Sequence, residues 1–279
     1  MDKYRSHRVT AFRDNEALKH RLHCWIFCET SKRPAIKLVW FFRPAVLIVL
    51  IVSLILIQPD LGTSAVIFAT VLGMLFVAGA QMKQFLLVIG LGLLGISALI
   101  IFVDWRWERI ISFIDPWRDP FGGGYQLTVS LMAIGRGEWF GVGLGEGLMK
   151  LGYLPDAHTD FIFSVLVEEM GLFTAILIIS TLFFISFRSF YIGRKALERN
   201  LYFGFFVAYG VAILIGLHTF INVGVATGLL PTKGLTLPFL SYGGTNLLIM
   251  CCLCALVLRV DQETKSAMPS VNISRRVRF

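Results

Sequence analysis

Long apolar runs separated by short polar stretches constrain this chain more than any other feature of its sequence. Hydrophobic residues make up 56% of its 279 residues, only 16% are charged, and the mean hydropathy is +0.72, whereas a soluble domain is about 25% charged. A helix needs about 20 mainly apolar residues to cross a bilayer. We therefore expect an all-α, polytopic membrane protein with six spanning helices, running over about residues 38–57, 63–80, 85–103, 160–187, 201–225 and 245–258.

The charged residues predict which side of the membrane each connecting segment faces. Basic residues outnumber acidic ones in residues 1–43, 188–199 and 259–279, whereas acidic residues predominate in 104–160. Because Lys and Arg concentrate on the cytoplasmic side, we expect both termini in the cytoplasm and the long loop 104–160 outside. The net charge of +8 then reflects topology. With no basic patch interleaved with aromatic residues, we expect no nucleic-acid partner.

This topology divides the chain into three parts. We expect a basic cytoplasmic N-terminal segment (1–37), a membrane domain (38–260) and a basic cytoplasmic tail (261–279). The membrane domain has two outer loops, about 104–160 and 226–244, and residues 125–134 of the first are amphipathic enough to lie along the membrane surface or dip into it.

The most informative polar stretch ends the long loop, where His158, Thr159 and Asp160 meet the start of the fourth apolar segment. Thr159 or Asp160 could cap that helix by accepting hydrogen bonds from its free N–H groups. Alternatively, Asp160 is a partly desolvated carboxylate at the membrane edge, available as a general base. Both interpretations remain open from the spacing alone.

Two carboxylates, Glu168 and Glu169, follow about two turns into the same predicted helix. Ser164 and Glu168 extend along roughly the face of Asp160, and Glu169 points elsewhere. Such charges are costly inside a membrane unless they face protein or water. They therefore predict either a structural network or, as we prefer, a polar path for substrate.

The long loop also carries two cations, Arg136 and Lys150, which could bind a phosphate or pyrophosphate or remain solvated loop charges. The segment 241–244, Ser-Tyr-Gly-Gly, resembles a phosphate-cradling turn but equally suits the start of a helix. His218 and Asn222 lie four residues apart, and we interpret them as interhelical hydrogen-bond partners rather than metal ligands.

Several short strings, in order along the chain, carry a family resemblance. From about Phe42 to Lys265 the chain resembles the C-terminal six helices of the SEDS family (shape, elongation, division and sporulation), which comprises FtsW, RodA and SpoVE. The matching strings lie at 58–63, 124–128, 133–137, 141–145, 157–163, 168–171, 222–224, 230–239 and 241–244. The amino-acid sequence of residues 231–238 is more like that of FtsW than that of RodA.

The resemblance implies a septal peptidoglycan glycosyltransferase of the bacterial cytoplasmic membrane that polymerises lipid II, an undecaprenyl-pyrophosphate disaccharide-peptide. Asp160 matches the presumed catalytic aspartate, which deprotonates the acceptor sugar hydroxyl. Arg136 and Lys150 are candidates to stabilise the leaving pyrophosphate. A divalent cation could share that role, although no metal-ligand cluster supports one. Further candidates for substrate binding are Gln126, His158, Thr159, Glu168, Glu169, Ser241 and Gly243.

The same resemblance implies a class B penicillin-binding protein and other divisome membrane proteins as partners. Two other functions remain open: a lipid II flippase, and a non-catalytic scaffold for the penicillin-binding protein. Family members usually have ten helices, and this sequence lacks the first four, since residues 1–37 resemble no part of them. We therefore expect a truncated chain.

Overall fold

The computed structural model describes residues 50, 53–55, 61–77, 82–101, 109, 111–232 and 234–267. The chain divides into two units, Met1–Leu54 and Ile55–Phe279, and all of the following helices belong to the second. They are α3 (Leu61–Val77), α4 (Met82–Ile101), α6 (Tyr125–Gly137), α7 (Ile162–Glu198), α8 (Tyr202–Ala226) and α9 (Gly244–Ser266). No strand occurs among the described residues, which confirms the all-α prediction.

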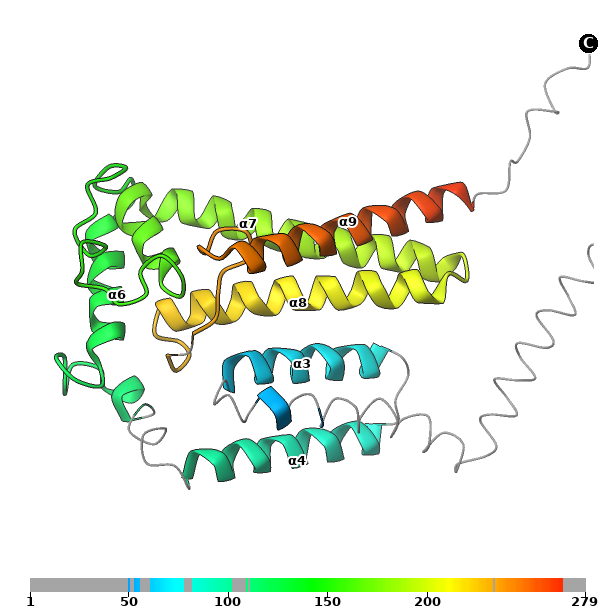
Figure 1. Cartoon of the computed structure of the whole chain (residues 1–279), viewed down its shortest axis with the longest axis horizontal. Coiled ribbons are helices and arrows are strands. Elements are labelled where there is room, and N and C mark those ends of the chain that lie inside the picture. Colours follow the sequence, from blue (N-terminus) through cyan, green and yellow to red (C-terminus); the bar gives the residue numbers. More distant parts are fainter. Residues whose placement is uncertain are drawn as a thin grey trace, which may run out of the picture. The chain divides into compact units, whose positions relative to one another are not determined.

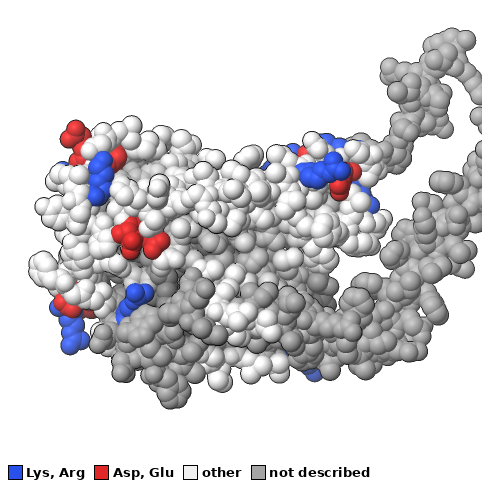
Figure 2. All heavy atoms as spheres, viewed as in Figure 1, with Lys and Arg blue, Asp and Glu red and all other residues white. Residues whose placement is uncertain are grey.

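Three of these helices are long and apolar enough to cross a membrane: α7 with 37 residues, α8 with 25 and α9 with 23. At about 1.5 Å per residue, α8 alone is roughly 37 Å long, enough for a hydrocarbon core of about 30 Å. On the face drawn in Figure 2, charged side chains gather toward the two ends of the described helices and leave an uncharged band between them. These features fit a polytopic membrane protein.

The shorter apolar helix α3 and the helix α4 correspond to the second and third predicted segments. The first predicted segment, 38–57, lies mostly outside the described residues, as do the N-terminal segment 1–37 and the end of the tail. The boundaries at 37 and 260 therefore stay predictions. In the long loop, the amphipathic stretch does form a helix, α6.

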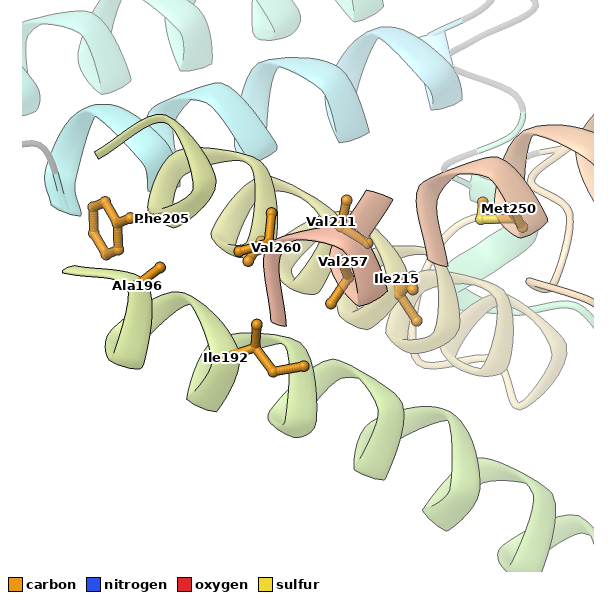
Figure 3. Close-up of a cluster of buried hydrophobic side chains, with 9 residues drawn as sticks. Ile192, Ala196, Phe205, Val211, Ile215, Met250, Val257 and Val260 are labelled. Carbon is orange, nitrogen blue, oxygen red and sulfur yellow. The ribbon is translucent and has the colours of Figure 1, made fainter. Parts of the chain in front are cut away.

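Helix α8 is the centre of the packing, since it contacts α3, α6, α7 and α9, while α7 also contacts α6 and α9 (Figure 1). Aliphatic and aromatic side chains from three helices form one buried cluster (Figure 3): Ile192 and Ala196 of α7, Phe205, Ala208, Val211 and Ile215 of α8, and Met250, Val257 and Val260 of α9. A Cβ at Gly193 would lie 2.5 Å from Tyr209 Cδ2. The close approach of α7 and α8 therefore depends on a small residue, as is common between membrane helices.

Two helices extend beyond the predicted apolar runs. Helix α7 continues through the expected linker 188–199 as far as Glu198, and α9 continues past Leu258 to Ser266. Ion pairs one turn apart accompany both extensions: Arg194–Glu198 in α7, and Arg259–Glu263 and Asp261–Lys265 in α9. Such i,i+4 pairs support helix outside an apolar environment, so hydropathy alone underestimated these lengths.

The prediction of one continuous helix over 160–187 was wrong in a second respect. Helix α7 begins at Ile162 and is interrupted at Gly171, whose backbone has φ 80° and ψ 170°. Glycine adopts this positive φ at little steric cost. The interruption separates a short first part of α7, residues 162–170, from the long part that follows, and it removes the helical partners of several backbone groups.

A segment of the long loop, residues 138–143, supplies new partners for those groups. We call it the crossing segment. Its amides at Val142 and Gly143 donate to the carbonyls of Glu168 (2.9 Å) and Glu169 (3.0 Å). Its carbonyls at Glu138 and Trp139 accept from the amides of Leu172 (3.0 Å) and Phe173 (3.2 Å). Non-helical backbone at a membrane helix is tolerated where protein satisfies it, and the crossing segment meets that condition.

Replacing Gly171 with alanine tests this join. A Cβ at Gly171 would lie 2.3 Å from the carbonyl oxygen of Trp139, at a φ that L-residues rarely adopt. We expect Gly171→Ala to destabilise the fold by roughly 1–3 kcal/mol, seen as a lower midpoint of thermal unfolding in detergent. Gly135→Ala is the matched control, because nothing lies within 4 Å of a Cβ there. An unchanged midpoint for Gly171→Ala would contradict the observed break.

Candidate functional site

The backbone around Asp160 is held by three hydrogen bonds in a row. Asp160 lies just before α7, and its residue is half-buried. The carbonyls of His158, Thr159 and Asp160 each accept a hydrogen bond from a residue beyond position 220. The donors are the Tyr242 amide (2.9 Å), the Ser241 hydroxyl (2.6 Å) and the Asn222 side-chain amide (2.8 Å). Three consecutive anchored carbonyls fix where the Asp160 side chain leaves the backbone.

The prediction that Thr159 or Asp160 caps α7 was wrong. Phe161 occupies the N-cap position, and no side chain caps the helix. The Thr159 hydroxyl instead donates to the carbonyl of Asp156 at 3.2 Å. That same carbonyl accepts from the amides of Thr159, Asp160 and Phe161. The turn before α7 is thus stabilised by hydrogen bonds to the Asp156 carbonyl.

The Asp160 carboxylate faces the second loop, between α8 and α9. A Cβ added to Gly234 would lie 2.8 Å from Asp160 Oδ2, so glycine at this position permits the backbone to approach the carboxylate. Sequence reasoning did not include Gly234 in the site. The available signal was its place in the string 230–239, the longest one shared with the family.

Asn222 joins this site to the membrane helices. It is 1% exposed, and its Nδ2 donates both to the Asp160 carbonyl and to the Leu235 carbonyl at 2.5 Å. One turn earlier, His218 Nδ1 lies 3.4 Å from the Thr236 carbonyl oxygen. The two residues do form hydrogen bonds, as expected, but their partners are loop carbonyls rather than neighbouring helices.

Ser241 has a structural role that the sequence did not reveal. Its buried hydroxyl accepts from the Leu237 amide (2.6 Å) and donates to the Thr159 carbonyl. These bonds favour the start-of-helix interpretation of 241–244 over the phosphate cradle. Gly243 directly precedes α9 in an extended conformation, and the nearest atom to a Cβ there is 3.6 Å away. His158, whose carbonyl accepts from the Tyr242 amide, is exposed.

A second polar cluster lies at the other end of the short first part of α7. Glu168 is fully buried, and its carboxylate accepts from Arg136 Nη1 (3.1 Å) and from the amides of Leu148 (2.9 Å) and Met149 (3.3 Å). The structure thus brings together Arg136 and Glu168, which the sequence analysis had not paired. The charge of Glu168 is satisfied by the long loop, which favours the structural network over the substrate path for this residue.

Glu169 makes an equivalent set of contacts. Its Oε1 lies 2.5 Å from Lys150 Nζ, and its Oε2 accepts from the Gly145 amide at 3.1 Å. A Cβ at Gly147 would lie 2.8 Å from Glu169 Oε1. The alternating glycines of the long loop therefore let its backbone wrap around the two carboxylates. Both predicted pyrophosphate ligands, Arg136 and Lys150, have carboxylate partners here.

Ser130 joins helix α6 to both α7 and α8. Ser130 Oγ lies 2.6 Å from Ser164 Oγ and donates to the Ala226 carbonyl at 2.8 Å, so one hydroxyl of α6 contacts both α7 and α8. Gln126 lies in the first turn of α6 and is half-buried. Within the described residues, no group of three or more His, Cys, Asp or Glu side chains is arranged to hold a metal ion.

The ion pair between Arg136 and the buried Glu168 predicts the effect of neutralising Glu168. Glu168→Gln keeps the size of the side chain but removes the charge that faces Arg136, and hydrogen bonds to charged groups contribute about 1.5–3 kcal/mol. We expect a loss of that order in the free energy of unfolding, without any substrate present. The matched control is Glu198→Gln, which breaks an exposed pair and should cost less than about 0.5 kcal/mol. Equal stability of the two variants would contradict the structural role.

Comparison with known proteins places this arrangement in a family. The model of the cell cycle protein family FtsW/RodA/SpoVE matches residues 11–266, which is most of the chain. The chain belongs to the FtsW/RodA/SpoVE family. The match begins well before Phe42, where the recognisable strings suggested that the resemblance starts.

Curated members of the FtsW/RodA/SpoVE family are close in sequence. The chain is 47% identical over 225 residues to a protein of Aliivibrio salmonicida named probable peptidoglycan glycosyltransferase FtsW, covering 81% of this chain and 56% of that protein. Proteins of the same name are 50% identical in Escherichia coli O6:H1, with 54% of that protein covered, and 51% identical in Moranella endobia, with 60% covered. Each of these two alignments covers 81% of this chain. The chain spans little more than half the length of these relatives.

A solved structure supports the family's fold for this chain. It is a chain from work described as structural coordination of polymerization and crosslinking by a peptidoglycan synthase complex. The two chains superpose with a TM-score of 0.62 at 30% sequence identity, covering 83% of this chain and 64% of the other. The two chains therefore share a fold over most of this chain.

Proposed function

We propose that this chain carries the catalytic aspartate of an FtsW-like peptidoglycan glycosyltransferase, which polymerises lipid II at the division septum. Two findings support the proposal: relatives about half identical in sequence are named probable peptidoglycan glycosyltransferases, and Asp160 is held at the junction of two loops and a membrane helix. The observation that carries it is the row of anchored carbonyls at 158–160, because a general base must be positioned before it can be effective.

The proposed chemistry is a glycosyl transfer with Asp160 as the base. Its carboxylate takes the proton from the acceptor sugar hydroxyl as that oxygen bonds to the anomeric carbon of the donor. The bond between this carbon and the pyrophosphate oxygen breaks at the same centre, and the lipid pyrophosphate leaves with the electron pair. Half-burial of Asp160 at the membrane edge allows a carboxylate to meet both a sugar hydroxyl and a lipid-anchored donor.

The other candidate residues have supporting roles in this proposal. His158 and Thr159 flank the base, whereas Ser241 and Gly243 shape the loop opposite, and Gln126 of α6 stays a candidate for substrate binding. Arg136 and Lys150 remain candidates to stabilise pyrophosphate, with Glu168 and Glu169 holding them in place. The Arg136 side chain is 36% exposed beside Glu168, so it is not fully enclosed by protein. A divalent cation could share the charge of the leaving group.

The proposal extends to the surroundings of the enzyme. We place it in the bacterial cytoplasmic membrane with cytoplasmic termini, as the charge distribution favours. A class B penicillin-binding protein and other divisome membrane proteins are its proposed partners. The solved relative, which comes from a peptidoglycan synthase complex, supports assembly of this kind.

Asp160→Asn tests the catalytic role with a minimal change of shape. We expect glycan synthesis from lipid II to fall at least 100-fold, since a positioned base typically contributes 10²–10⁴-fold. The measurement is gel analysis of glycan chains made by the purified full chain together with a class B penicillin-binding protein. Membrane insertion should be unchanged.

Asp156→Asn is the matched control, because it is the same substitution in the same turn at an exposed residue with φ 52°, which asparagine also adopts. It should retain activity. Normal glycan from Asp160→Asn would contradict the role as base and favour transport of lipid II. Glycan synthesis that requires the partner but not Asp160 would favour a scaffold.

A further inference from the structure

Four residues at the end of α7 opposite Asp160 form a stripe. Arg188, Tyr191 and Lys195 are spaced by three and four residues and lie on one face of α7, and Arg199, the C-cap residue directly after the helix, follows four residues later. Three of the four are cations. We call them the basic stripe.

An aromatic ring organises the first half of the stripe. Arg188 Cζ lies 5.2 Å from the centroid of the Tyr191 ring, and Lys195 Nζ lies 4.6 Å from it. Both distances are within the range of cation–π attraction. The ring therefore holds two positive charges close to each other, although they repel, on a face where Tyr191 is 48% exposed.

The stripe has no carboxylate to balance it within the described part of the chain. The acids at this end of the helices each pair one turn away with a cation outside the stripe: Glu198 with Arg194, Glu263 with Arg259 and Asp261 with Lys265. In addition, Arg199 Nη1 is buried without a hydrogen-bond partner. A buried cationic donor without a partner is unfavourable, so the stripe as a whole lacks an anion.

The position of the stripe indicates where that anion comes from. Phe184 and Phe187, one turn before the stripe, are 67% and 69% exposed on the lipid-crossing part of α7. The exposed surface of α7 therefore changes from aromatic to cationic over about one turn, as it does where a helix leaves the hydrocarbon for the headgroups. An anion at this depth is provided by the lipids themselves.

We propose that the basic stripe binds the phosphate of an anionic phospholipid. The headgroup phosphate sits between Arg188 and Lys195, above the edge of Tyr191, and its acyl chains lie along Phe184 and Phe187. This site is independent of Asp160 and lies at the opposite end of the helix.

Lipid titration of the purified full chain in detergent tests the site. Native mass spectrometry would count bound phosphatidylglycerol, phosphatidylcholine of matched chains, and inorganic phosphate. We expect the chain to retain phosphatidylglycerol in preference to the other two. The variant Arg188→Gln/Lys195→Gln should bind it at least about 10-fold more weakly, since each basic residue near a lipid surface contributes about 1 kcal/mol. Arg188 is exposed, so Arg188→Gln alone provides a second variant that leaves the fold intact.

The matched control is Arg194→Gln/Arg259→Gln, which removes two charges from the same end but from cations that already have partners. Its affinity for phosphatidylglycerol should stay within about 2-fold of the original chain. Equal binding of phosphatidylcholine, displacement of the lipid by inorganic phosphate, or an equal loss in the control variant would each overturn the proposal. The last result would mean diffuse attraction by net charge.

Discussion

A broken membrane helix must have its freed backbone groups satisfied by protein, and this constraint organises the described structure. At Gly171 the amides and carbonyls of α7 lose their helical partners, and the crossing segment 138–143 replaces them. The long loop is therefore joined to a membrane helix through main-chain hydrogen bonds. Because that join requires the loop backbone to pass close to α7, glycines occur where it does so. A Cβ at Gly141 would lie 2.2 Å from the Glu169 carbonyl oxygen.

The short first part of α7 is held at both ends as a result. Its C-terminal end carries Glu168 and Glu169, whose charges are met by Arg136 and Lys150 from the loop. Its N-terminal end follows Asp160, whose backbone is anchored to α8 and to the second loop. A catalytic group is most useful on an element whose own position is fixed by packing and hydrogen bonds. In this chain the fixed element is a helix of two to three turns, attached to the membrane domain by polar contacts rather than by apolar burial alone.

The sequence predicted the class of fold because hydrophobic length is a strong signal, and five described helices (α3, α4, α7, α8 and α9) begin within three residues of their expected starts. It failed where a different interaction overrides hydropathy. Gly171 gave no sign of a break, since a single glycine is tolerated in many helices. The helical ends to Glu198 and Ser266 depend on ion pairs that an apolar run does not register. Asp160 was proposed from its polar neighbours and from the family strings. The residues that anchor its backbone, Asn222 and Ser241, are more than 60 residues away and could be paired with it only in three dimensions.

The long loop is fixed to α7 by the hydrogen bonds at the break, and amide hydrogen exchange measures those bonds directly. In the purified full chain, we expect the amides of Val142, Gly143, Leu172 and Phe173 to exchange on the order of 100-fold or more slowly than in unstructured peptide, because each must open before it exchanges. They should also become accessible together, as one cooperative unit. Fast exchange at Val142 and Gly143 while Leu172 and Phe173 remain protected would instead show that α7 is continuous and that the loop is not joined to it.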